Sequence, residues 1–244
     1  MNKVIQADNF NLITLKNPKS PSSEAYRTLR TNIQFSSFDK KAQVVFITSS
    51  GPGEGKSTVA ANLAVVMAES GSRTILVDCD QRKPRVHKNF NLSNVKGLSN
   101  YLAGEADFES CINETSINNL AIMTSGVRPP NPAELLGSKK MIEFVDSLRQ
   151  KYDFVILDTP PVLMVTDAQL LSRCSDGCLL VVSSGEVARE GVIKAKELLE
   201  KVNTKILGVV LNKVQQSSRS NYGYYYYYYY DDEGIKHKHK KKKK

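Results

Sequence analysis

The chain has 244 residues, of which 41% are apolar and 24% charged, an ordinary composition for a globular protein. This composition excludes a collagen, a fully disordered chain and a disulfide-stabilised miniprotein. The net charge of +9 is unevenly spread, because residues 222–244 hold seven Lys and three acidic residues and contribute +4. Eight of the 11 Tyr lie within residues 222–230. The last 23 residues are therefore a separate segment that any function has to explain.

Hydropathy and cysteine spacing narrow the class of protein further. No apolar run approaches the roughly 18 residues of a membrane-spanning helix, and the N-terminus lacks the layout of a signal peptide. We therefore expect a cytoplasmic protein. The cysteines have neither zinc-site nor disulfide spacing, so we expect reduced thiols at Cys79, Cys111, Cys174 and Cys178.

The predicted elements alternate between helices and short apolar strands. Residues 1–20 show little periodicity and predict an N-terminal arm. Helices are predicted over residues 21–35, 57–69, 138–151 and 186–202, with short ones near 97–102 and 107–113. Strands rich in Val, Ile and Leu are predicted at 44–47, 74–77, 120–123, 154–157, 179–182 and 206–211. This alternation indicates an α/β, doubly wound fold with a mostly parallel sheet over residues 21–215, followed by a flexible tail, 216–244.

A glycine-rich turn between the first predicted strand and its helix is the strongest motif. Its glycines let backbone N–H groups approach phosphate oxygens, and the helix N-terminus adds partial positive charge. Lys56 can reach the terminal phosphates and the Ser57 hydroxyl can bind Mg²⁺. Ser50 stands where the strict phosphate-loop pattern has glycine, so a glycine-rich turn with an accidental Lys-Ser pair is the alternative. The expected nucleotide-binding residues are Gly51, Pro52, Gly53, Glu54, Gly55, Lys56, Ser57 and Thr58.

Acidic residues end two of the apolar strands. Asp78 and Asp80 follow one strand and Asp158 follows another. The carboxyl ends of parallel strands meet at one edge of a sheet, so these side chains are expected beside the phosphate loop. Carboxylates suit a hard cation such as Mg²⁺, whereas helix or turn caps are the alternative for any single Asp. Asn212, at the end of the last strand, could bind an adenine edge or simply end the strand in a turn.

These motifs together resemble those of the bacterial tyrosine kinases, of the capsular or exopolysaccharide autokinase type. The resemblance spans roughly residues 20–230 and extends to a Glu-x2-Arg-x2-Arg pattern, a Pro-rich loop over residues 129–136 and the terminal Tyr cluster. It implies a P-loop NTPase of the deviant Walker type that is a protein-tyrosine kinase. It also implies an oligomeric ring with Glu24, Arg27 and Arg30 at the subunit interface.

The same resemblance implies roles for the site residues and for partners. Lys56 and Ser57 would bind ATP and Mg²⁺, Asp80 and Asp158 would help to hold Mg²⁺, and Asp78 would be the base. The expected activator is the cytoplasmic tail of a separate membrane protein that controls polysaccharide chain length, and a phosphotyrosine phosphatase would reverse the reaction. The expected phosphate acceptors, used in trans, are Tyr222, Tyr224, Tyr225, Tyr226, Tyr227, Tyr228, Tyr229 and Tyr230.

The tail can also be interpreted without any substrate role. A run of tyrosines is low-complexity sequence with a risk of aggregation. The Lys run 240–244 fits an anionic membrane surface, nonspecific nucleic-acid binding or a solvated end without a partner. We expect no specific nucleic-acid partner, and His237 and His239 are too isolated for a metal site.

Two other functions compete with the kinase. A partitioning or septum-placement ATPase shares the deviant loop but carries a signature Lys five positions before the loop Lys, where this chain has Gly51. A non-catalytic scaffold would use the lysines to anchor polysaccharide enzymes at a membrane surface. Such a scaffold would keep its function after Lys56→Met, whereas a kinase would lose it.

Overall fold

The computed structural model describes residues 11–36 and 42–215. The chain divides into two units, Met1–Lys213 and Val214–Lys244. Nearly all of the second unit lies outside the described residues, and so does the tail predicted at 216–244 with its tyrosines. The fold is therefore that of the first unit. No helix within the two described ranges is long and apolar enough to cross a membrane.

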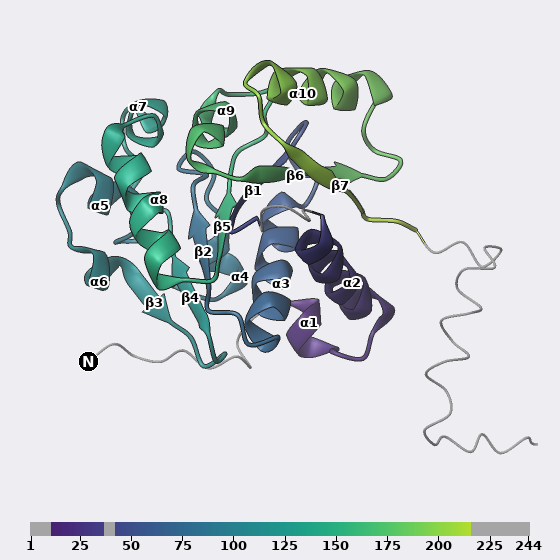
Figure 1. The fold of residues 1–244 in the computed structure, drawn as a ribbon, viewed down its shortest axis with the longest axis horizontal. Helices are drawn as coiled ribbons and strands as arrows, with labels where there is room; N and C mark the ends of the chain where they lie inside the picture. Colours follow the sequence, from purple (N-terminus) through teal and green to yellow (C-terminus); the bar gives the residue numbers. More distant parts are fainter. Residues whose placement is uncertain (1–10, 37–41, 216–244) are drawn as a thin grey trace, which may run out of the picture. The chain divides into compact units, whose positions relative to one another are not determined.

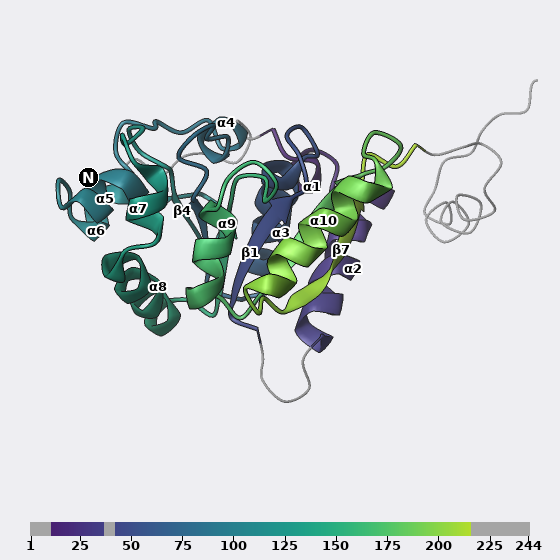
Figure 2. The ribbon, with the colours of Figure 1, turned by 90° about the horizontal axis from the view of Figure 1, so that it is seen from above.

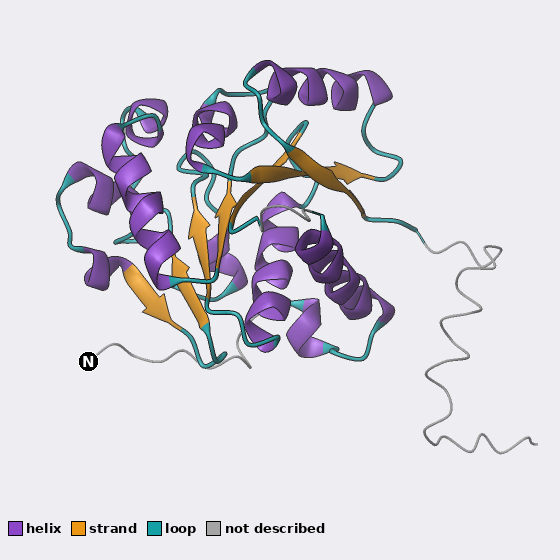
Figure 3. Ribbon diagram, viewed as in Figure 1, coloured by secondary structure: helices purple, strands orange, loops and turns teal. Residues whose placement is uncertain are grey.

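One mixed sheet forms the centre of the first unit (Figure 3). In the described part of the chain it has seven strands in the order β3-β4-β2-β5-β1-β6-β7. All neighbouring pairs are parallel except β3 and β4, which are antiparallel. The strands are β1 (Val44–Ser49), β2 (Thr74–Asp78), β3 (Ile112–Glu114), β4 (Leu120–Met123), β5 (Phe154–Asp158), β6 (Gly177–Ser183) and β7 (Ile206–Asn212). The mostly parallel α/β fold expected from the sequence is confirmed.

Helices cover both faces of the sheet (Figures 1 and 2). Each face has its own apolar cluster. One face is covered by α1 (Ile13–Lys16), α2 (Pro21–Phe35), α3 (Lys56–Glu69) and α4 (Val86–Asn89). The other is covered by α5 (Leu98–Ala103), α6 (Phe108–Cys111), α7 (Pro132–Leu136), α8 (Lys139–Lys151), α9 (Asp167–Leu171), the 3₁₀ helix η2 (Ser172–Cys174) and α10 (Arg189–Lys201). The strands β1, β2 and β5 are buried along their whole length, which accounts for their apolar runs 44–47, 75–77 and 154–157.

The N-terminal segment differs from the expected arm. Residues 11–20 of the predicted 1–20 arm belong to the folded unit, and Leu12 is fully buried. The backbone N–H and the hydroxyl of Thr14 both donate to the Asn62 side-chain oxygen on α3, at 3.1 and 2.9 Å. Because α1 has only four residues, it has no periodicity to detect. Likewise, the helix predicted near 107–113 ends at Cys111, and β3 follows it.

Asp176 connects the beginning of β1 to α8 through hydrogen bonds. Its Oδ2 atom accepts hydrogen bonds from the backbone N–H groups of Gln43 and Val44, both at 2.8 Å. The Arg149 guanidinium donates to the two carboxylate oxygens at 2.8 and 2.9 Å. Burial raises the pKa of Asp176, but the hydrogen bonds from Arg149, Val44 and Gln43 outweigh it and leave this pKa below its ordinary value.

We expect Asp176→Asn to lower the free energy of unfolding by about 1–2 kcal/mol at pH 7, because the charge-assisted bonds to Arg149 are lost. A depressed native pKa adds stability above the unfolded pKa, and this stability is lost as the pH falls through the native pKa. The difference between wild type and variant should therefore be constant above about pH 5 and shrink below about pH 4. Urea unfolding across this range measures it, and a difference that grows in acid would contradict the assignment.

Candidate active site

The phosphate loop joins β1 to α3 in a backbone conformation that only glycine adopts readily. Gly53 and Gly55 have φ angles of 83° and 89°, and a side chain at Gly55 would overlap the Asn212 amide. Lys56 and Ser57 open α3, so the first N–H groups of this helix have no acceptor within it. The loop therefore offers backbone donors and a helix N-terminus to an anion, as the sequence motif predicts.

Glu54 has a structural role that the motif does not reveal. Its buried carboxylate accepts hydrogen bonds from the Ser50 hydroxyl and the Gly51 N–H through Oε1, and from the Ser183 N–H at 3.1 Å through Oε2. The side chain thus points into the protein, which leaves the backbone of Glu54 for any contact with phosphate. Ser50, the departure from the strict motif, supplies one of these internal bonds.

Asn212 lies at the end of β7, next to the phosphate loop. Its Nδ2 atom donates to the Glu54 carbonyl at 2.9 Å. The side chain therefore connects the edge strand of the sheet to the loop. Its expected contact with an adenine edge stays a prediction.

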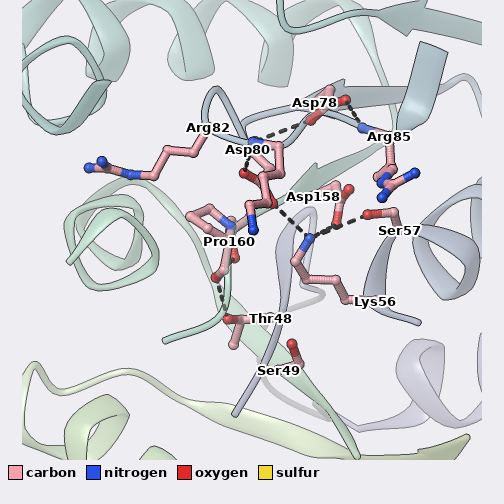
Figure 4. A network of polar contacts seen from close by, with 12 residues as sticks. Thr48, Ser49, Lys56, Ser57, Asp78, Asp80, Arg82, Arg85, Asp158 and Pro160 are labelled. Carbon is pink, nitrogen blue, oxygen red and sulfur yellow. Dashed lines mark hydrogen bonds and ion pairs between the residues drawn. The ribbon is translucent and has the colours of Figure 1, made fainter. Parts of the chain in front are cut away.

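Lys56 lies among the acidic strand ends (Figure 4). Its Nζ atom is 2.9 Å from Oδ2 of Asp80, 3.9 Å from Oδ1 of Asp158 and 3.3 Å from the Ser57 hydroxyl oxygen. Burial lowers the pKa of Lys56, but the negative charges of Asp158, Asp80 and Asp78 outweigh it and raise this pKa above its ordinary value. The group is thus a permanent cation at the mouth of the phosphate loop.

Asp78 is fully buried and holds the loop that follows β2. Its Oδ1 atom accepts from the N–H of Asp80 at 3.1 Å, and its Oδ2 atom accepts from the N–H groups of Arg85 and Val86 at 3.1 and 3.0 Å. Burial, followed by the charge of Asp158, raises the pKa of Asp78 well above its ordinary value. A raised pKa suits a proton acceptor, while the three backbone bonds fix the position of the carboxylate.

Asp158 is the residue whose environment most clearly indicates a ligand. Both of its carboxylate oxygens are buried without a hydrogen bond from any described residue. Burial raises its pKa to about 6, although the charge of Lys56 opposes the shift. A buried carboxylate without hydrogen bonds is costly, and a hard cation would offset that cost.

Within the described residues, no group of three or more His, Cys, Asp or Glu side chains could hold a metal ion by itself. Proteins usually hold Mg²⁺ through one or two carboxylates together with water and phosphate oxygens. Asp158, Asp80 and the Ser57 hydroxyl all lie around the Lys56 Nζ atom and therefore fit such a shared site.

Arg82 braces the loop that follows β2 and carries Asp80. It forms two parallel hydrogen bonds to the fully buried Asp167, from Nε and Nη2, both at 3.0 Å. In Figure 4 its side chain points away from Lys56. Its partner on α9 lies 85 residues further along the chain, so the pair leaves no local signal in the sequence.

The three residues expected at a subunit interface lie on α2 and outside this cluster. Arg27 pairs with Glu24 at 3.0 Å, and Arg30 donates to the Val66 carbonyl of α3 at 3.1 Å. Each thus has an intramolecular partner, and their interface role stays a prediction.

A glycine-rich loop with a buried lysine and a facing row of strand-end carboxylates is the arrangement typical of the P-loop class. Residues 42–213 match a family model described as an AAA domain. The chain is 49% identical to tyrosine-protein kinase YwqD of Bacillus subtilis over 87% of this chain and 90% of that protein. It is 42% identical to the putative tyrosine-protein kinase CapB of Staphylococcus aureus over 84% and 90%. The chain belongs to the family of bacterial tyrosine-protein kinases.

Solved structures agree with this family. The chimerical protein CapA2B2 matches with a TM-score of 0.82 and 45% identity, covering 88% of this chain and 94% of that one. The kinase domain of Escherichia coli ETK matches with 0.81 and 34%, covering 85% and 82%. The septum site-determining protein MinD of Pyrococcus horikoshii, complexed with Mg-ADP, matches less well, with 0.62 and 28% over 73% of each chain. The greater likeness to kinases agrees with Gly51 replacing the signature Lys of the partitioning ATPases.

We expect Asp158→Asn to raise the free energy of unfolding at pH 8 by about 1–2 kcal/mol. The native pKa of about 6 lies above the ordinary 3.8, so ionisation of Asp158 makes the fold less stable as the pH rises through this interval. The variant should therefore lose less stability than wild type between about pH 4 and pH 7. Urea unfolding of the nucleotide-free chain measures this, with the exposed Asp146→Asn as a control that should show no change. A variant less stable than wild type at pH 8 would contradict it.

Proposed function

We propose that the chain binds ATP with Mg²⁺ and transfers the terminal phosphoryl group to tyrosines of its own C-terminal cluster. The observation that carries this proposal is the pair of Asp158 oxygens without hydrogen bonds, buried beside Lys56 at the phosphate loop. Magnesium would supply charge neutralisation between the phosphate oxygens, with Asp158, Asp80 and Ser57 as its protein contacts. Tyr222 and Tyr224–Tyr230 are the proposed acceptors.

Different groups of the chain perform different parts of the phosphoryl transfer. Backbone N–H groups of residues 53–58 hold the phosphate chain, and the Lys56 ammonium stabilises the negative charge that develops on the moving group. The Lys56 ammonium is 2.9 Å from Asp80, so it has to interact with this carboxylate and with the phosphate at the same time. Asp78 positions the tyrosine hydroxyl, whose ordinary pKa is about 10, and accepts its proton late in the transfer. Because Asp78 is fully buried, the loop over residues 79–86 has to open for a hydroxyl to reach it.

The tail is a suitable substrate in reach and in charge. About ten residues separate β7 from Tyr222, and fully extended they span roughly 35 Å, which permits attack in cis or in trans. Each phosphate adds about −1.5 to −2 charges at pH 7, so two or three cancel the +4 of residues 222–244, and further phosphates make this segment negative. We favour transfer in trans within a ring whose subunits meet at Glu24, Arg27 and Arg30.

The proposed physiological role is control of capsular or exopolysaccharide synthesis and export at the inner face of the cell membrane. The proposed partners are the cytoplasmic tail of a membrane activator and a phosphotyrosine phosphatase. An anionic membrane surface would attract the Lys run 240–244 at about 1 kcal/mol per Lys. We expect the purified chain to be weakly active without its activator.

We expect Lys56→Met to abolish phosphotyrosine in residues 215–244, because the charge that clamps the phosphates is removed. Mass spectrometry of the tail after incubation with ATP, Mg²⁺ and activator compares the variant with wild type. Lys213→Met, which breaks only the exposed pair with Glu186, is the control that should keep full phosphorylation. A partitioning-type ATPase would release free phosphate and leave the tail unlabelled in both proteins.

We expect phosphorylation to dissociate the oligomer, because the tail changes sign in every subunit at once. The measurement compares the mass in solution of the phosphorylated protein with that of a variant in which all eight tail tyrosines are Phe. The Phe variant should remain the larger assembly. Equal masses would refute the proposed effect of the tail's charge on the oligomer. Arg27→Ala tests the interface separately, and we expect it to lower the mass of the unphosphorylated assembly.

A further inference from the structure

A row of exposed cations follows the aspartates of the site. Lys83, Arg85 and Lys88 are exposed at the end of the loop after β2 and on α4, and we call them the basic ridge. None of the three forms an ion pair with a described residue, although ten such pairs occur elsewhere in that part of the chain. Arg85 and Lys88 both lie near the His87 imidazole: burial, then the charges of Lys88 and Arg85, lower its pKa.

The backbone connects the basic ridge directly to the aspartates. The N–H of Lys83 donates to Oδ1 of Asp80 at 2.9 Å, and the N–H of Arg85 donates to Oδ2 of Asp78 at 3.1 Å. Figure 4 shows the Arg85 side chain on the same side of the cluster as Ser57, whereas Arg82 points the other way. A peptide whose tyrosine reaches Asp78 therefore has its neighbouring residues beside these cations.

The tail offers a matching set of charges. Asp231, Asp232 and Glu233 follow directly after Tyr230, and residues 222–234 contain no Lys or Arg. This stretch therefore carries a charge of −3 within a tail that is basic further on. Opposite charges on two surfaces increase the rate of encounter and fix the register of the bound segment.

We propose that the basic ridge binds the acidic triplet Asp231–Glu233 and so selects which tail tyrosines enter the site. This inference rests on the proposal that the tail is the phosphate acceptor. With Tyr230 at the site, the triplet lies within about 10 Å along an extended chain, whereas with Tyr224 in place Asp231 is about 25 Å away. The ridge therefore favours the last tyrosines, Tyr228–Tyr230, as the first to be phosphorylated.

The test measures transfer between two versions of the full chain. The enzyme has all eight tail tyrosines replaced by Phe, and the acceptor is the Lys56→Met chain with its native tail. A second acceptor carries Asp231→Asn, Asp232→Asn and Glu233→Gln in addition. We expect the neutral triplet to raise the KM for the acceptor about tenfold and to leave the KM for ATP unchanged.

The enzyme variant Lys83→Gln/Arg85→Gln/Lys88→Gln should show the same rise in the KM for the acceptor with the native tail. It should show no further rise with the acceptor that carries the neutral triplet. Its backbone donors to Asp78 and Asp80 are retained. The matched control, Arg189→Gln/Lys194→Gln/Lys201→Gln, removes the same charge from exposed positions of α10. An equal rise in the KM for the acceptor in the control variant would overturn the proposal. So would a raised KM for ATP with an unchanged KM for the acceptor.

Two further measurements separate this inference from the proposed function. Phosphate mapping at early times should find Tyr228–Tyr230 modified before Tyr222–Tyr225, and an even distribution would contradict the ridge. Fluorescence anisotropy measures binding of a labelled peptide of residues 222–234 to the full chain, without any catalysis. Binding that weakens with salt and with the ridge variant supports the docking even if no tail tyrosine is phosphorylated, in which case only the proposed function fails. Equal affinity of wild type and ridge variant would refute the docking.

Discussion

One buried ammonium group among three buried carboxylates is the constraint on which the site depends. Asp78, Asp80 and Asp158 are exposed by no more than 3%, and Lys56 by 9%. Taking such charges out of water costs several kcal/mol per ion, and a single cation offsets only part of that cost. The two apolar clusters on either side of the sheet make the arrangement possible, because their packing holds the strand ends in register despite the cost of burying the charges. At this site the buried charges lower the stability of the fold and provide the groups that the proposed reaction needs.

The two loops around this cluster are held by contacts to different elements. The phosphate loop is fixed from inside by Glu54, which bonds to β6, and from the edge of the sheet by Asn212. The loop after β2 is fixed by Asp78 through backbone bonds and by the ion pair of Arg82 with Asp167. Each loop therefore has a brace on a different element.

Much of this arrangement could be predicted from local sequence. The helix predicted at residues 21–35 coincides with α2, because its cap at Ser20 and its proline at the first turn are local signals. The convergence of Asp78, Asp80 and Asp158 follows from one rule of parallel sheets. The role of Glu54 could not be predicted, since its partner Ser183 lies 129 residues away. β3 was missed for a similar reason, because its three residues are held in place by pairing with β4 and not by their own pattern.

The charge of the tail connects the chemistry of the site to its regulation. The last strand, β7, ends at Asn212, whose side chain contacts the phosphate loop, so the folded unit ends next to the proposed nucleotide site. Before reaction, the acidic triplet is the only negative stretch after Tyr222, and the proposed docking on the basic ridge depends on its three charges. Every phosphate then adds about −1.5 to −2 charges next to the triplet. The charge proposed to guide the tail to the site is therefore the same charge that phosphorylation changes, so the proposed docking and the proposed dissociation of the oligomer both depend on one segment.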